Sequence, residues 1–131
     1  TNSKQIVLAK SSGICRVRVQ VADANGVASN PVETLVVVDS KPPEIQKISG
    51  QNGAMATTSG TFYVVVQATD DMSGQVQACA SVDGGVFGSW YNVPQSAIPV
   101  TLSTTGAHSI TVKVKDFAGN ESQASMVAFR I

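Results

Sequence analysis

The sequence predicts an all-β protein that folds as a β-sandwich. Apolar and polar residues alternate in short runs, and no apolar stripe with helical spacing persists over three turns. Gly, Asp, Asn and Ser separate the runs at intervals of about ten residues, which suits two stacked antiparallel sheets. With 131 residues the chain is slightly long for one small sandwich, so the extra length requires an explanation.

Side-chain alternation within each run indicates which face of each strand is buried. In residues 108–115, for example, His108, Ile110, Val112 and Val114 share the face that we expect to lie inside. The candidate strands are residues 5–9, 14–22, 32–39, 44–48, 61–69, 76–82, 89–93, 97–102, 108–115 and 125–131. The expected core consists of Phe62, Val64, Val66, Ile98, Val100, Leu102, Ile110, Val112, Val114, Val127 and Phe129.

Two turns between these strands have strong sequence signals. Asp83-Gly84 favours a tight hairpin turn, because glycine adopts positive φ without steric cost. In residues 116–120 the Asp116 carboxylate can accept N–H bonds across the turn, while Gly119 and Asn120 tolerate positive φ. Each turn therefore predicts a pair of neighbouring antiparallel strands.

A proline pair and an internal similarity divide the chain. Pro42 and Pro43 lack backbone N–H groups and favour extended backbone, so they interrupt strand pairing and act as a semi-rigid spacer. When the chain is shifted by 93 residues against itself, seven positions carry the same residue. The pairs are Val7 and Val100, Gly13 and Gly106, Val19 and Val112, Val21 and Val114, Asp23 and Asp116, Gly26 and Gly119, and Ser29 and Ser122. We predict that residues 1–40 are the C-terminal strands of a truncated module and that residues 41–131 form a complete module.

Composition argues against several classes of function. Lys plus Arg and Asp plus Glu both number 9, so the formal net charge is zero, which disfavours nucleic acid or an anionic membrane surface as partner. No apolar run is long enough to insert into a membrane.

Cys15 and Cys79 are expected on opposite types of strand face in different modules, which makes a disulfide between them unfavourable. We therefore expect free thiols, or disulfides with cysteines outside residues 1–131.

Three motifs carry a resemblance to a known family. ATDDMSG, SVDGGVFGSW and TGAHSITVKVKDFAGNES occur in residues 68–122, in an order and spacing similar to the bacterial immunoglobulin-like repeats of secreted and surface proteins. The likeness covers nearly all of residues 44–131, and residues 1–39 repeat its last strands. It implies an immunoglobulin-like β-sandwich and leaves the function open, since this scaffold serves as stalk, adhesin or enzyme appendage.

The strongest candidate site is a calcium site at one end of the sandwich. Asp70, Asp71, Asp116 and Asn120, with Glu44 as a further candidate, supply the hard oxygen ligands that calcium prefers. If the module has immunoglobulin-like topology, these turns meet where modules join. The same residue types also act simply as caps for loop N–H groups, and this second explanation stays open.

The residues do not favour an enzyme. His108, the only histidine, lies on a core-facing position, and the chain has no GxSxG-type nucleophile turn. Asp70 and Asp71 are adjacent and should point apart, unlike a catalytic carboxylate pair across a substrate. A binding module is the alternative, with Trp90, Tyr91 and Tyr63 as a stacking surface for a sugar or peptide, although one ring of the Trp90–Tyr91 pair should pack against the sandwich.

We therefore expect a structural spacer repeat of a bacterial protein, secreted or anchored at the cell surface, that presents neighbouring domains of the same polypeptide. The alternative is an adhesin or carbohydrate-binding module using Trp90. The apolar face expected on residues 1–40 predicts a two-fold homodimer in which this segment pairs with the same segment of a second copy. The side chains expected on that face are Val7, Ala9, Cys15, Val17, Val19, Val21, Val36 and Val38. Disorder of residues 1–40, or their packing onto residues 44–131, would be the other ways to deal with that face.

Overall fold

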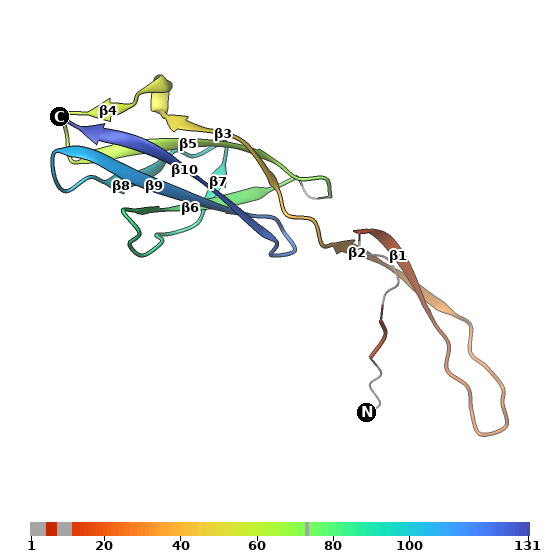
Figure 1. The fold of residues 1–131 in the computed structure, drawn as a ribbon. Helices are drawn as coiled ribbons and strands as arrows, with labels where there is room; N and C mark the ends of the chain where they lie inside the picture. The colour runs from red at the N-terminus through yellow and green to blue at the C-terminus, as the bar shows by residue number, and fades with distance from the viewer. Residues whose placement is uncertain (1–4, 8–11, 73) are drawn as a thin grey trace. The chain divides into compact units, whose positions relative to one another are not determined.

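The chain folds as two compact units, an N-terminal unit (Thr1–Ser40) and a sandwich unit (Lys41–Ile131). The structure is a computed structural model, shown in Figure 1, and describes residues 5–7, 12–72 and 74–131. Apart from one 3-10 turn, η1 (Gln51–Gly53), all of its regular elements are strands. The prediction of an all-β sandwich is confirmed.

The sandwich unit contains one sheet of three strands and one of five. The smaller sheet has the order β3-β5-β8, and the larger has the order β4-β10-β9-β6-β7. The strands are β3 (Glu44–Gly50), β4 (Ala56–Thr57), β5 (Thr61–Thr69), β6 (Val76–Val82), β7 (Tyr91–Val93), β8 (Ile98–Thr101), β9 (Gly106–Lys115) and β10 (Glu121–Arg130). Every pairing is antiparallel except that of β4 with β10.

The inner faces of the two sheets form a single apolar core. Nine of the eleven residues expected there are buried: Phe62, Val64, Val66, Ile98, Val100, Leu102, Ile110, Val112 and Val114. Val76, Ala78, Ala80, Val93 and Ala128 complete it. Burying one such aliphatic side chain stabilises a fold by about 1.5–3 kcal/mol, so this cluster is the main source of stability.

The predicted buried face of β10 is wrong. Val127 and Phe129 are 48% and 43% exposed, whereas Ala128 is fully buried and Met126 packs against the core. Register decides this, because Met126 and Ala128 lie opposite Ile110 and His108 on the inner face of β9. Both faces of β10 carry apolar residues, so alternation by itself does not decide which face is buried.

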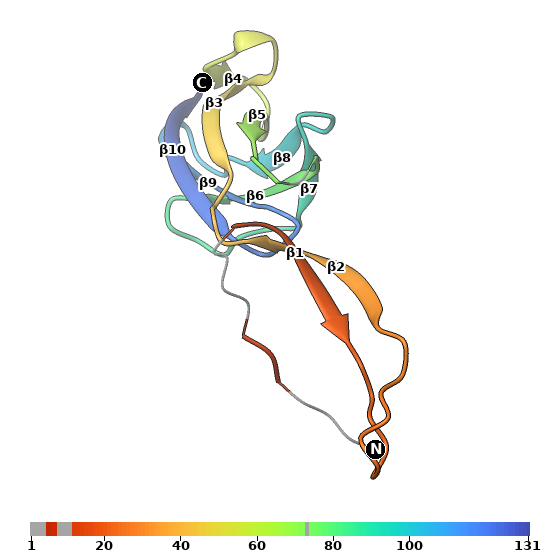
Figure 2. The same cartoon turned by 90° about the vertical axis from the view of Figure 1, so that its right-hand side faces the viewer.

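The connection from β3 to β5 contains an element that the sequence did not reveal. After Gly50 the chain passes through η1 and reaches β4, two residues that pair in parallel with Phe129 and Arg130. A two-residue strand has no alternation to detect. As a result, β3 belongs to one sheet and β4 to the other, and β3 runs beside β10 at the side of the sandwich (Figures 1 and 2).

The N-terminal unit is a two-stranded hairpin of β1 (Ser12–Val19) and β2 (Val32–Asp39). The strand expected at residues 5–9 is absent from Gln5 to Val7, and residues 8–9 lie outside the described residues. Of the side chains expected to point toward a core, Cys15, Val17, Val36 and Val38 are half-buried, Val7, Val19 and Val21 are exposed, and Ala9 lies outside the described residues. The hairpin therefore encloses no core of its own.

Candidate functional site

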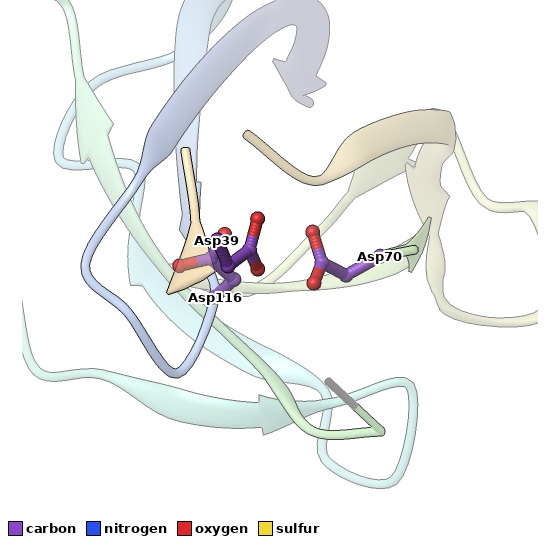
Figure 3. A group of neighbouring side chains, drawn as sticks. All are labelled: Asp39, Asp70 and Asp116. Atoms are coloured by element: carbon purple, nitrogen blue, oxygen red, sulfur yellow. The ribbon is translucent and has the colours of Figure 1, made fainter. Parts of the chain in front are cut away.

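Two predicted calcium ligands of the sandwich unit approach one another. Asp70 follows β5 and Asp116 follows β9, and each offers a carboxylate oxygen within 4.8 Å of the other (Figure 3). Asp39, also labelled in Figure 3, belongs to the N-terminal unit. The turn after β5 and the turn after β9 thus bring two acidic groups to the same end of the sandwich.

Asp116 also holds its own turn together. Its Oδ1 accepts the backbone N–H of Asn120 at 2.9 Å, and its Oδ2 accepts the Asn120 side-chain amide at 2.9 Å. The backbone adds a bond from Asp116 N to Asn120 O and another from Gly119 N to Asp116 O. Asp116 is only 4% exposed, so these bonds satisfy a carboxylate that would otherwise be costly to bury. The Asn120 amide therefore acts in the turn as a donor to Asp116.

The other acidic candidates lie around a small hollow of about 150 Å³. Glu44, Asp70 and Asp71 line it together with Lys41, which brings a positive charge to the same place. Asp71 is exposed, while Asp70 is half-buried and its Oδ2 accepts the backbone N–H of Met72 at 3.2 Å. Calcium takes six to eight oxygen ligands, and the two carboxylates that meet here supply only part of that shell. A calcium site at this end of the sandwich stays a prediction.

The two neighbouring aromatic residues point to opposite faces of the larger sheet. Tyr91 packs against the core, as expected for one ring of the pair. Trp90 is half-buried, and the Nζ of Lys115 on β9 lies 4.2 Å from the centre of its ring. Lys113 makes the same contact with Phe87 at 4.3 Å. These cation–π contacts fold the β6–β7 connection over the outer face of β9. Lys115 occupies one side of the Trp90 ring, and sugar stacking there stays a prediction.

The buried histidine links two turns of the sandwich unit. His108 Nδ1 lies 2.7 Å from Asp83 Oδ2, and His108 Nε2 lies 2.7 Å from the backbone oxygen of Thr104. The other oxygen of Asp83 accepts the backbone N–H of Ser109. Both ring nitrogens face acceptors, and only a doubly protonated imidazole can donate to both.

The surroundings of this pair shift both of its pKa values. The bond to Thr104 and the bond to Asp83 raise the pKa of His108 above its usual value, against the opposing effects of burial and of the positive charge on Arg130. The bonds from His108 and Ser109 lower the pKa of Asp83. The sequence placed His108 on the inner face but did not identify Asp83 as its partner, because 25 residues separate them.

Within the described residues, none of the helical segments has the length and apolar character needed to span a membrane. Cys15 and Cys79 are free thiols, and Cys79 is buried, which raises its pKa.

Comparison with known proteins supports the fold of the sandwich. No family model and no curated protein matches the sequence. Among solved structures, the chain is similar to the PKD domain of an M14-like peptidase from Thermoplasmatales archaeon SCGC AB-540-F20. The two are 20% identical with a TM-score of 0.50, and the match covers 69% of this chain and 96% of that domain. At this identity the likeness supports the immunoglobulin-like fold.

Proposed function

We propose that this chain is a structural spacer of immunoglobulin-like modules, part of a bacterial protein that is secreted or anchored at the cell surface. The main support is that the turn of the N-terminal hairpin repeats the β9–β10 turn. Asp23 N donates to Val27 O and Gly26 N donates to Asp23 O, just as Asp116 N donates to Asn120 O and Gly119 N to Asp116 O. Two turns of one design, 93 residues apart, are what a string of similar modules requires.

A spacer must transmit load between the domains at its ends, and the sandwich unit has strand geometry suited to this. β4 and β10 lie side by side in parallel, with Phe129 N donating to Met55 O at 3.0 Å and Ile131 N donating to Thr57 O at 2.9 Å. β4 lies near the start of the unit, and β10 ends it. Pulling on the two ends of the unit therefore shears the β4–β10 hydrogen bonds, because the force acts along the strands. Bonds loaded in shear must break together.

The proposed role has no catalytic step. In this proposal His108 is a structural residue, because both of its nitrogens are engaged by Asp83 and Thr104. Few charged residues, at 14% of the chain, and a preponderance of small polar and β-branched residues suit a location outside the cytoplasm. Neighbouring domains of the same polypeptide are the proposed partners.

Single-molecule force spectroscopy tests the spacer. The full chain is inserted between reference domains and stretched through its ends. We expect one cooperative unfolding event of the sandwich unit, with a length gain of about 300 Å at roughly 3.3–3.6 Å per extended residue. Extension without a force peak would contradict a mechanical role.

A matched pair of variants locates the resistance. Phe129→Pro removes the N–H that donates to Met55 and should lower the unfolding force. Val127→Pro is the control. The Val127 N–H points to the same side of β10 but lies beyond the end of β4, and a proline is tolerated at an open strand edge. Equal loss of force in both variants would show that the β4–β10 contact does not carry the load.

A further inference from the structure

Two asparagines of the chain are followed directly by glycine, in Asn25-Gly26 and Asn52-Gly53. In such a pair the glycine backbone nitrogen can attack the asparagine Cγ, because glycine has no side chain to obstruct the approach, and this makes the asparagine chemically labile. A succinimide ring forms, and the asparagine Nδ2 leaves as ammonia. Water then opens the ring at either of its two carbonyls, which gives aspartate or isoaspartate. In isoaspartate the main chain passes through the side-chain carboxyl group and is one carbon longer.

The first pair lies in a turn that holds the attacking nitrogen. The backbone N–H of Gly26 donates to Asp23 O at 3.1 Å. The N–H groups on either side of it, from Asn25 and Val27, both donate to Asp23 Oδ1, at 2.9 and 3.0 Å. Hydrogen bonds to a carboxylate are stronger than those between neutral groups. Ring closure at Asn25 must break this arrangement, so we expect the reaction there to be slow.

The second pair lies in η1, the short turn between β3 and β4 (Figure 1). Asn52 is exposed, and no hydrogen bond holds its side chain to another described residue. Its φ of 57° and ψ of 26° are left-handed and interrupt the 3-10 turn, which a bond from Ala54 N to Gln51 O closes at 3.1 Å. A Cβ placed on Gly53 would meet no atom within 4 Å. The asparagine side chain and the glycine therefore have room to rotate into the geometry for ring closure.

The ends of this turn leave no room for a longer main chain. Gly50 and Ala54 lie against each other, and a Cβ on Gly50 would collide with the Ala54 carbonyl oxygen. The same Cβ would lie 2.7 Å from the ring of Phe62, a core residue. An isoaspartate at position 52 adds one carbon to the short segment that joins these two ends. Because Gly50 is buried against the core, the added length displaces Ala54.

Ala54 leads directly into the pairing of β4 with β10. The next residue, Met55, accepts the backbone N–H of Phe129 at 3.0 Å, and Thr57 accepts that of Ile131 at 2.9 Å. β4 consists of two residues, so the pairing is too short to resist a shift of the segment that precedes it. A displacement of Ala54 therefore weakens these two bonds first.

We propose that Asn52 is a site of spontaneous deamidation and that the isoaspartate formed there releases β4 from β10. Water is the co-reactant, and the products are ammonia and a carboxylate. Aspartate, the other product, has the same charge but keeps the normal main-chain length, and it tolerates the left-handed φ at this position. It should therefore leave β4 in place. This inference does not depend on the spacer role.

Mass spectrometry of the full chain, kept in mildly alkaline buffer and digested at intervals, tests the reaction. A synthetic peptide of residues 48–56 gives the rate in the absence of the fold. We expect Asn52 to convert at no less than a tenth of the peptide rate, and Asn25 to convert several-fold more slowly than Asn52. Fragmentation that distinguishes isoaspartate from aspartate should show both products at position 52. A chain in which Asn52 stays intact while the peptide reacts would overturn the proposal.

Amide hydrogen exchange followed by NMR tests the effect on β4. In isoaspartate-containing chains the N–H of Phe129 should exchange at least tenfold faster than in fresh chains. The N–H of Ala128, which points to β9, should change less than twofold.

Two matched controls isolate the effect of the added carbon. Fresh Asn52→Asp chains carry the charge alone, and aged Asn52→Gly chains keep the left-handed turn but cannot form the ring. Both should exchange at Phe129 as the fresh wild type does, and their dispersed NMR spectra show that they are folded. Unchanged exchange at Phe129 in isoaspartate-containing chains, or equally fast exchange in either control, would overturn the release of β4.

Discussion

The β1–β2 hairpin and the β9–β10 hairpin have the same turn design but bury their side chains to different extents. Gly26 and Gly119 have φ values of 81° and 92°, and in both turns the leading aspartate accepts the backbone N–H four residues later, at 3.0 Å and 2.9 Å. Yet Val112 is fully buried in β9, whereas Val19, its counterpart in β1, is 49% exposed. The local sequence is therefore sufficient to shape the turn, and the strands packed against a hairpin decide what it buries.

The largest expected effect separates the two valines. Val112→Ala leaves a gap in the core and should lower the free energy of unfolding by about 2 kcal/mol or more. Val19→Ala should change it by less than about 0.5 kcal/mol. Urea melts followed by the fluorescence of Trp90, the only tryptophan, report on the sandwich unit. A loss below about 0.5 kcal/mol for Val112→Ala would show that this face of β9 is not the buried one.

A smaller effect is expected at the shared turn glycines. Gly119→Ala forces an L side chain into the left-handed region and should destabilise the sandwich unit by about 1 kcal/mol, although the added methyl meets no atom within 4 Å. Gly26→Ala imposes the same strain on the N-terminal hairpin and should leave the Trp90 transition unchanged. Gly119→Asn should recover part of the loss, because asparagine tolerates positive φ. An equal shift for both alanine variants would show that the two hairpins unfold as one cooperative unit.

Calcium distinguishes the two turns if the predicted site exists. Asp116 lies near Asp70, whereas Asp23 is in an exposed turn. With an affinity typical of extracellular modules, millimolar calcium should stabilise the sandwich unit by about 1 kcal/mol and raise its melting temperature by a few degrees. Asp70→Asn should remove the shift, and Asp23→Asn is the matched control. The same midpoint in calcium and in chelator contradicts the site.

The smallest expected effect is a dependence of stability on pH, and only the β9–β10 hairpin should show it. Where β9 has His108, the equivalent position of β1 has Cys15. The pKa of His108 is raised on folding, so its stabilising contribution is complete below the ordinary value of 6.5 and is lost as the pH rises through the higher folded value. The lowered pKa of Asp83 keeps the partner charged until well into the acid range. Asp83 is 53% exposed, so solvent screening keeps the effect modest.

Asp83→Asn tests this dependence with little change in shape. Asparagine retains an acceptor for Ser109 and tolerates the φ of 51° at this position, but it lacks the charge that holds the imidazolium. Thermal melts between pH 5.5 and 8.5 should show a smaller pH-dependent loss of stability for the variant than for the wild type. Parallel curves for the two proteins would show that this ion pair does not contribute.

Local features of the sequence determined the architecture. Short runs of apolar residues between turn signals predicted the strands at 32–39, 61–69 and 76–82, which match β2, β5 and β6. Asp83-Gly84 and residues 116–120 predicted their turns because the required positive φ values depend on residue type alone. Asp70 and Asp116 were also predicted to converge, because immunoglobulin-like topology places both turns at one end of the sandwich.

Only the tertiary structure decided the features that depend on contacts between distant residues. Both faces of β10 are apolar, so its register with β9, rather than its composition, buried Met126 and exposed Phe129. The pairing of Asp83 with His108 arises because two turns meet at the same end of the sandwich. The partial cover of β10 by β4 arises because a two-residue strand has no sequence period. Alternation and turn chemistry act over a few residues, whereas burial, charge pairing and strand edges depend on which chain segments are neighbours in space.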